Sequence, residues 1–300
     1  MRAITACLAL LVALAVASCG GSDPPPRTTA KAGPVRIGTK NFTESEILGE
    51  LYKQALEAKG FRVELQSSVG PGELTNRALR LGLLDMYPEY VGVLLSEVDK
   101  VVSRPTSPQA AYRLAKEIEE RRGFTLLKPT RLSNENALAV KESFGRRRGV
   151  SSIPDLARLR PDERVGVAPE FTTRFEGSKG LRKLYRLSLR TKLVNVPGGR
   201  QYPELDSGRV AAASVFTTDS QLARGRYTLL RDPKGVFAKN HVAPVISQKA
   251  LKAHGPLLAA TLNAVSALLT TPVMRDLNAM AATRTPRQVA DEFLRTHGLK

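Results

Sequence analysis

Lys40 lies just before a predicted helix start, where it could help to bind an anion. Thr43, with Glu46 three residues later, fits a capping box, which places the first helical turn just after Thr43. Backbone N–H groups at a helix start attract negative charge, and a nearby ammonium group adds to that attraction. The same residues also fit an ordinary turn with a solvated lysine. The pattern alone leaves both interpretations open.

Side chains that catalyse reactions are sparse and scattered in this chain. The three histidines are far apart, and no nucleophile elbow, P-loop or His/Cys cluster at metal-ligand spacing occurs. Asp85 and Glu89 are close in sequence, but Pro88 between them favours a turn, so we interpret them as structural rather than as a catalytic pair. The sequence predicts a protein that is not an enzyme, with no cofactor and no metal.

Alternating strands and helices must position these groups. Val35 and Ile37 alternate with polar neighbours as in a short buried strand, and the helix after Thr43 ends at Gly60. A strand at 61–65, a helix at 73–81 and a strand at 83–87 follow, which is the order of an α/β layer. Later strands are predicted at 136–140, 164–169, 210–216 and 242–246, and later helices at 110–122, 257–269 and 274–280. We therefore predict an α/β fold, in one large domain or two lobes.

Two stretches resemble motifs of a known family. Residues 38–44 read GTKNFTE, which closely resembles the opening motif of the glycine betaine/choline-binding proteins of ABC importers. Residues 85–92 read DMYPEYVG and resemble the D-x-Y-P-E-Y-T-G motif of the same family. The resemblance implies a substrate-binding lipoprotein that captures a small osmoprotectant-like solute and delivers it to the transmembrane permease subunit of an ABC importer.

The resemblance also implies a two-lobe fold, the periplasmic-binding-protein fold of type II. Residues 34–138 and 243–300 would form lobe one, and residues 139–242 would form lobe two. The apolar runs at 136–140 and 242–246 would cross between the lobes and act as a hinge, about which the lobes close on the solute.

The family's motifs assign six residues to the ligand site: Lys40, Tyr90, Asn136, Arg174, Phe216 and Asn240. Lys40 matches the lysine of the opening motif and Arg174 the arginine of an E-F-x-x-R segment, so the two would hold a carboxylate from opposite lobes. Tyr90 and Phe216 match aromatic positions of a cage that holds a quaternary ammonium by cation–π attraction.

Two tyrosines of that cage are missing here. Asn136 and Asn240 fall where the family has tyrosines, so we expect an incomplete cage and a more polar, carboxylate-bearing solute. In the alternative, Tyr87 or Phe171 swings in and rebuilds the cage. A different function also stays open: an exported structural or adhesion lipoprotein on the same fold that has lost ligand binding.

The N-terminus fits an exported lipoprotein. Residues 4–17 are almost wholly apolar, too few to span a bilayer but suited to a signal peptide. The run ends in VASCG at 16–20, which matches the lipobox of bacterial lipoproteins. We predict a signal peptide at 1–18, a lipid on Cys19 and a flexible tether at 19–33, which anchors the protein on the outer face of the cytoplasmic membrane. Export also argues against a nucleic-acid partner, despite the formal net charge of +18.

The lipid anchor is testable through Cys19. Since the thioether forms on this cysteine, exported wild-type protein should incorporate a labelled fatty acid and partition into detergent, whereas Cys19→Ala should do neither. Equal labelling of the two proteins would show that Cys19 is not the attachment site.

Overall fold

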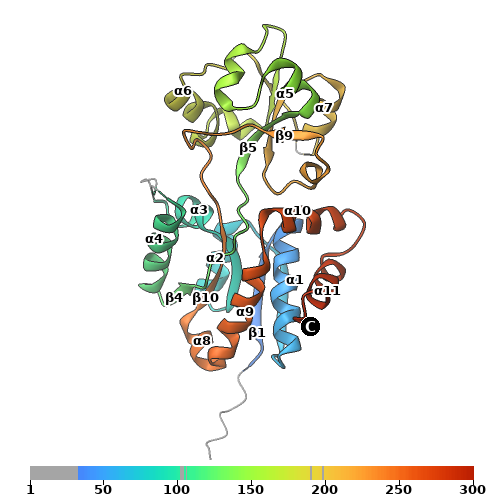
Figure 1. Cartoon of the computed structure of the whole chain (residues 1–300). Helices are drawn as coiled ribbons and strands as arrows, with labels where there is room; N and C mark the ends of the chain where they lie inside the picture. Colours follow the sequence, from blue (N-terminus) through green and yellow to red (C-terminus); the bar gives the residue numbers. More distant parts are fainter. Residues whose placement is uncertain (1–32, 102–104, 106, 190, 198) are drawn as a thin grey trace, which may run out of the picture. The chain divides into compact units, whose positions relative to one another are not determined.

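The computed structural model describes residues 33–101, 105, 107–189, 191–197 and 199–300. The predicted signal peptide, Cys19 and all of the predicted tether except Gly33 therefore lie outside the described residues. Within the described part, ten strands form two five-stranded sheets, each with helices around it (Figure 1). We call the parts built on these sheets the first lobe and the second lobe.

The first sheet combines the N-terminal strands with one that arrives late in the chain. Its order is β2 (Val63–Gly70), β1 (Val35–Lys40), β3 (Met86–Tyr90), β10 (Val242–Ser247) and β4 (Phe124–Leu126). The first three are parallel, whereas β10 runs antiparallel to both β3 and β4. The predicted strand at 35–37 is thus confirmed. Residues 242–246, expected to cross between the lobes, instead lie in β10 and complete the first sheet.

The prediction of a turn at Pro88 was wrong, because this residue lies inside β3, opposite Pro244 of β10. Val91 N–H donates to the carbonyl of His241, 2.9 Å away, which makes those two residues a hydrogen-bonded pair. Such pairs alternate with non-hydrogen-bonded ones along an antiparallel ladder, so Pro88 and Pro244 form a non-hydrogen-bonded pair. Proline, which has no N–H, is tolerated at both positions, because the residues of such a pair form no backbone hydrogen bond with each other.

The second sheet comes from one continuous stretch of chain. Its order is β7 (Leu193–Asn195), β6 (Val165–Val167), β8 (Ala212–Phe216), β5 (Asn136–Lys141) and β9 (Tyr227–Leu229). β5 pairs antiparallel with β8 from Asn136 opposite Phe216 onward. The lobe boundary expected between residues 138 and 139 therefore falls within β5.

The long N-terminal helix α1 (Thr43–Ala58) fills the first lobe's core with Ile47, Leu48 and Leu51. The predicted capping box is wrong: the cap position is Phe42, and the carboxylate of Glu46 accepts a hydrogen bond from Ser68 instead. α1 packs against α9 (Pro256–Leu268) and α11 (Pro286–Thr296), so the two ends of the described chain share one core (Figure 1).

The remaining helices and helical turns surround the two sheets. In the first lobe they are α2 (Gly72–Arg80), α3 (Val91–Val93), η1 (Leu94–Val98), α4 (Pro108–Glu120), α8 (Gln248–His254) and α10 (Thr271–Met280). In the second lobe they are α5 (Glu142–Arg148), η2 (Ile153–Arg158), η3 (Pro169–Thr172), η4 (Phe175–Lys179), α6 (Gly180–Tyr185), α7 (Gln201–Ser207) and η5 (Ser220–Arg224).

A buried hydrogen bond between Tyr52 and Ser266 ties α1 to α9 and yields a stability prediction. The two hydroxyl oxygens are 2.9 Å apart, and burial raises the pKa of Tyr52. Tyr52→Phe leaves the Ser266 hydroxyl without this partner, so it should lower the free energy of unfolding by about 1–3 kcal/mol in urea titrations. Combined with Ser266→Ala, the loss should be smaller than the sum of the single losses. Strict additivity would show that the two hydroxyls do not stabilise each other.

Candidate functional site

Lys40, the last residue of β1, points into the first lobe rather than into solvent. Its side chain is buried, and its Nζ lies 2.5 Å from Oε1 of Glu89 on β3. Its backbone N–H donates to the hydroxyl of Ser45, 2.9 Å away, in the first turn of α1. The ammonium group predicted from the opening motif is therefore held in place by a buried ion pair.

Tyr90, the last residue of β3, lies directly beside Lys40. The lysine Nζ is 4.3 Å from the centre of the Tyr90 ring, within cation–π range. The Tyr90 hydroxyl donates to Oε1 of Glu44, 2.5 Å away. Burial, together with the negative charge of Glu44, raises the pKa of Tyr90 well above its ordinary value, so this hydroxyl keeps its proton.

Phe42 covers this pair from the solvent side. Its ring centre is 6.0 Å from that of Tyr90 and 5.4 Å from Nζ of Lys40, yet 39% of the residue is exposed. The opening motif contains Phe42, but sequence reasoning did not assign it to the site. An apolar residue between a strand and a helix gave no signal that its ring would stay exposed.

Asn136 and Phe216 lie together on the second sheet as partners in the β5–β8 ladder. Phe216 ends β8 and is 47% exposed, an unusual state for a phenylalanine. The carboxylate of Asp219 accepts from the Phe216 backbone N–H at 3.1 Å and from the Tyr202 hydroxyl at 2.9 Å. Burial raises the pKa of Asp219 above its ordinary value. These contacts hold the backbone of Phe216 while leaving its ring accessible.

Arg174 lies at the start of η4 on the second lobe, with an exposed side chain. Two residues later, the carboxylate of Glu176 accepts from Asn136 Nδ2 at 3.0 Å and from the Ala238 backbone N–H at 3.3 Å. Glu176 therefore connects the Arg174 segment to β5, although the sequence had given no reason to select it.

Asn240 lies in the segment that leads back to the first sheet. Its Oδ1 accepts from the backbone N–H of Gly92, 2.9 Å away, and a Cβ at position 92 would also lie 2.9 Å from that oxygen. A larger residue at position 92 would therefore push the Asn240 side chain away from its present position. The next residues, from Val242, pair with β3 opposite Tyr90, which brings Asn240 near the Lys40–Tyr90 group.

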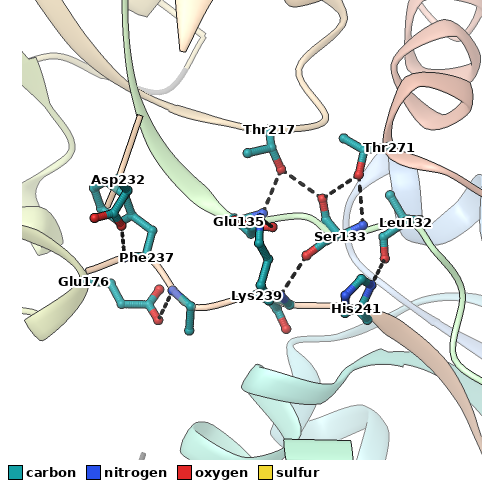
Figure 2. Close-up of polar contacts among 12 residues, drawn as sticks. Leu132, Ser133, Glu135, Glu176, Thr217, Asp232, Phe237, Lys239, His241 and Thr271 are labelled. Atoms are coloured by element: carbon teal, nitrogen blue, oxygen red, sulfur yellow. Dashed lines mark hydrogen bonds and ion pairs between the residues drawn. The ribbon is translucent and has the colours of Figure 1, made fainter. Parts of the chain in front are cut away.

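Hydroxyl groups from both lobes bind the first of the two segments that cross between the lobes (Figure 2). The hydroxyls of Thr217 and Thr271 both donate to the carbonyl of Ser133, at 2.9 and 3.1 Å. The Thr217 oxygen also accepts from the Glu135 N–H, and the Thr271 oxygen from the Ser133 N–H. One short stretch, 133–135, thus takes hydrogen bonds from the second lobe through Thr217 and from the first lobe through Thr271.

The crossing segments also pair with each other. Asn134 N–H donates to the carbonyl of Asn240, and Lys239 Nζ lies 3.0 Å from the carboxylate of Glu135. The ring Nδ1 of His241 donates to the carbonyl of Leu132 at 3.1 Å (Figure 2). Residues 132–135 and 239–241 therefore form one linked connection between the two sheets.

The carboxylate of Glu44 accepts hydrogen bonds from both sides of this connection. Its Oε1 accepts from Tyr90 and from Asn134 Nδ2, and its Oε2 accepts from Asn278 Nδ2 on α10 at 2.9 Å. Asn278 also donates to the carbonyl of Thr218 in the second lobe, at 3.0 Å. Glu44 belongs to the opening motif, but only the fold reveals that it links Tyr90 to the crossing segment.

The six predicted residues thus form two groups. Lys40 and Tyr90 are close together on the first sheet, with Asn240 in the crossing segment that contacts Gly92, and Asn136 and Phe216 are close together on the second sheet, with Arg174 on the same lobe. Tyr87 and Phe171, the aromatic residues considered as replacements in the cage, are both buried, in the first and second lobe cores respectively.

One hollow of about 580 Å³ lies on the first lobe, and another of about 470 Å³ is lined by first-lobe residues together with Lys239 and His241 of the crossing segment. None of the six residues lines either of them. No helix among the described residues is long and apolar enough to cross a membrane. In that same part of the chain, no group of three or more His, Cys, Asp or Glu side chains could hold a metal ion.

Comparison with known proteins identifies the family. Residues 33–296 match the model of the substrate-binding domain of ABC-type glycine betaine transport systems. A glycine-betaine-binding protein of Pseudomonas aeruginosa is 32% identical over 282 residues, 90% of each chain. An ergothioneine transport permease/binding protein of Helicobacter pylori is 28% identical over 279 residues, which cover 91% of this chain and 49% of that protein.

A solved structure agrees with the fold described above. Ligand-free YehZ of Escherichia coli superposes with a TM-score of 0.75 at 26% identity, covering 90% of this chain and 100% of that one. This likeness confirms the predicted α/β fold, and the family match confirms a binding protein rather than an enzyme. The chain belongs to the family of substrate-binding domains of ABC-type glycine betaine transport systems.

Proposed function

We propose that this protein captures a small quaternary-amine solute of the glycine betaine/choline class, or a more polar relative with a carboxylate, and delivers it to an ABC permease. A lipid on Cys19 holds it at the outer face of the cytoplasmic membrane. The names of its relatives in Pseudomonas aeruginosa and Escherichia coli, both glycine betaine-binding proteins, support the solute class.

The observation that carries this proposal is the position of Tyr90 and Phe216. Each ends a strand, and each pairs directly with a residue at the beginning of a strand that follows a crossing segment: Tyr90 with Val242, and Phe216 with Asn136. Aromatic residues from the two lobes therefore both lie next to the connection about which the lobes would close. A ligand held there contacts both lobes, which is how binding energy favours a closed form.

The charged groups support a carboxylate on the solute. Glu89 engages Lys40 Nζ through Oε1, and an ammonium has three N–H donors, so others remain for a ligand. Arg174 is exposed on the second lobe and offers a planar pair of donors that fits a carboxylate. We propose that Lys40 and Arg174 hold this group from the two lobes.

The aromatic part of the site is incomplete in this proposal. Phe216 and Phe42 have exposed rings, whereas Tyr90 is buried beside Lys40, and Tyr87 and Phe171 are buried in the lobe cores. Asn136 and Asn240 place amide groups where tyrosine rings are expected, and both already make hydrogen bonds within the protein. Losing two rings costs about 1–4 kcal/mol of cation–π attraction, so affinity for a trimethylammonium group should be modest.

The alternative, an exported structural lipoprotein without a ligand, has less support. A chain free of ligand binding has no need to keep the Phe216 ring exposed beside a crossing segment, where burial would stabilise the fold. Binding experiments separate the two functions directly.

Titration calorimetry with glycine betaine, choline, carnitine and ergothioneine tests the proposal. We expect at least one of these solutes to bind, with a dissociation constant above the low-micromolar range because the cage is incomplete. Low-micromolar binding of glycine betaine, choline or carnitine would contradict the incomplete cage alone. If none of the four bound, the proposed solute class would be wrong.

Removing the guanidinium of Arg174 should weaken binding of a carboxylate-bearing solute. A hydrogen bond to a charged group contributes about 1.5–3 kcal/mol, so Arg174→Ala should raise the dissociation constant for glycine betaine about tenfold or more. Arg158→Ala is the matched control, because Arg158 is also an exposed arginine of the second lobe and pairs with Asp155 at its surface. Equal affinity of the two variants would exclude Arg174 from the site.

A further inference from the structure

Two ion pairs extend from β1 at the same spacing in sequence, one to Asp85 just before β3 and one to Glu89 within β3. Arg36 Nη2 lies 2.8 Å from Oδ1 of Asp85, and Lys40 Nζ lies 2.5 Å from Oε1 of Glu89. The side chains of the first pair are 34% and 16% exposed, whereas those of the second are 6% and 1% exposed. Only the second pair lies beside Tyr90, at the end of the strands where the candidate site begins.

Glu89 does more than pair with a lysine. Its Oε1 accepts both from Lys40 Nζ and, at 2.7 Å, from the backbone N–H of Tyr90. Its Oε2 is buried without a hydrogen-bond partner among the described residues. That oxygen packs against Gly72 at the start of α2, where a Cβ would lie 2.8 Å from it. The carboxylate is therefore confined on both sides, and the helix start beside it favours its negative charge.

The charge of Glu89 changes the electrostatic field that a ligand meets beside Lys40. Lys40 presents a positive charge to the site, and Glu89 places a negative charge against it in a buried environment, where charges act more strongly than in water. Glu89 offsets the charge of Lys40 for a group that approaches Tyr90, while Glu44, which accepts from the Tyr90 hydroxyl, places a further negative charge nearby. Glycine betaine and choline therefore meet a site in which the positive charge of Lys40 is largely offset.

We infer that Glu89 determines the relative affinity of the site for solutes with and without a carboxylate. This inference rests on the proposed function, in which Lys40 contacts the ligand. Glu89 is a positioning residue, since it holds Lys40 and Tyr90 and offsets the lysine charge without contacting the solute. Without its charge, Lys40 attracts a carboxylate more strongly and repels an uncompensated cation.

The test is the ratio of glycine betaine affinity to choline affinity, measured by calorimetry on each variant. Both solutes carry the same trimethylammonium group, so the ratio isolates the carboxylate. Glu89→Gln keeps an oxygen that accepts from Tyr90 N–H but removes the charge. One unit charge a few ångströms from the ligand at an intermediate dielectric shifts affinity strongly, so the ratio should rise about tenfold or more.

Asp85→Asn is the matched control, since it removes the same charge from the half-buried Arg36–Asp85 pair, which is not beside Tyr90, and its ratio should equal that of wild type. The paired variant Lys40→Met/Glu89→Gln removes both charges, so its ratio should stay close to that of wild type if Glu89 offsets Lys40. It also tests the inference if Glu89→Gln alone does not fold, because a ratio about tenfold or more below wild type would show that Glu89 does not offset the lysine charge, and would overturn the inference.

Two further outcomes separate a failure of the inference about Glu89 from a failure of the proposed function. If Glu89→Gln weakens both solutes equally, Glu89 is merely structural and the inference is wrong, although the proposed function stands. If wild-type protein binds neither glycine betaine nor choline, the inference about Glu89 is wrong, whereas the proposed function fails only if carnitine and ergothioneine do not bind either.

Discussion

The buried ion pair between Lys40 and Glu89 is the constraint around which the first half of the site is arranged. Taking two charges out of water is costly, and removing only one partner of such a pair typically destabilises a protein by about 3–5 kcal/mol. The pair therefore fixes the end of β1 against the end of β3. Tyr90 and the first turn of α1 are fixed with it, through hydrogen bonds to Glu89 and from Lys40 to Ser45.

The connection between the lobes is held by single hydrogen bonds, each of which contributes less than the buried ion pair. Thr217, Thr271 and Ser133 exchange hydrogen bonds with backbone groups, each worth about 0.5–1.5 kcal/mol net. Such bonds can be exchanged for bonds to water without exposing an apolar core. The lobes themselves have separate apolar cores, and Leu132 belongs to the first, so a bend confined to 133–135 and 239–241 would leave both intact. A buried ion pair beside a connection of exchangeable hydrogen bonds would suit a protein that holds a solute and releases it.

Sequence reasoning located the elements better than the roles of their residues. Hydrophobic periodicity predicted β1, α1, β5, β8 and β10, because each buries an apolar face. It failed at Pro88, since only the pairing with Pro244 shows that a proline fits in this strand. Lys40 and Tyr90 were selected by motif, but their burial and their contacts depend on Glu89 and Glu44, residues 49 and 46 positions away respectively. The exposed ring of Phe42 and the link through Glu176 depend in the same way on contacts distant in sequence.

The insertion of β10 between β3 and β4 has a consequence for how the chain folds. A polypeptide is made from its N-terminus, and the second sheet is complete once β9 has emerged, whereas the first still lacks the strand between β3 and β4. An exported chain folds after it crosses the membrane, N-terminal part first, so β4 arrives there before β10, with the whole second sheet between them. Until β10 arrives, the edges of β3 and β4 lack the strand that pairs with them, and the apolar face of α1 lacks α9 and α11. The N-terminal third of the protein is thus the part that most needs protection from aggregation until its C-terminal third arrives.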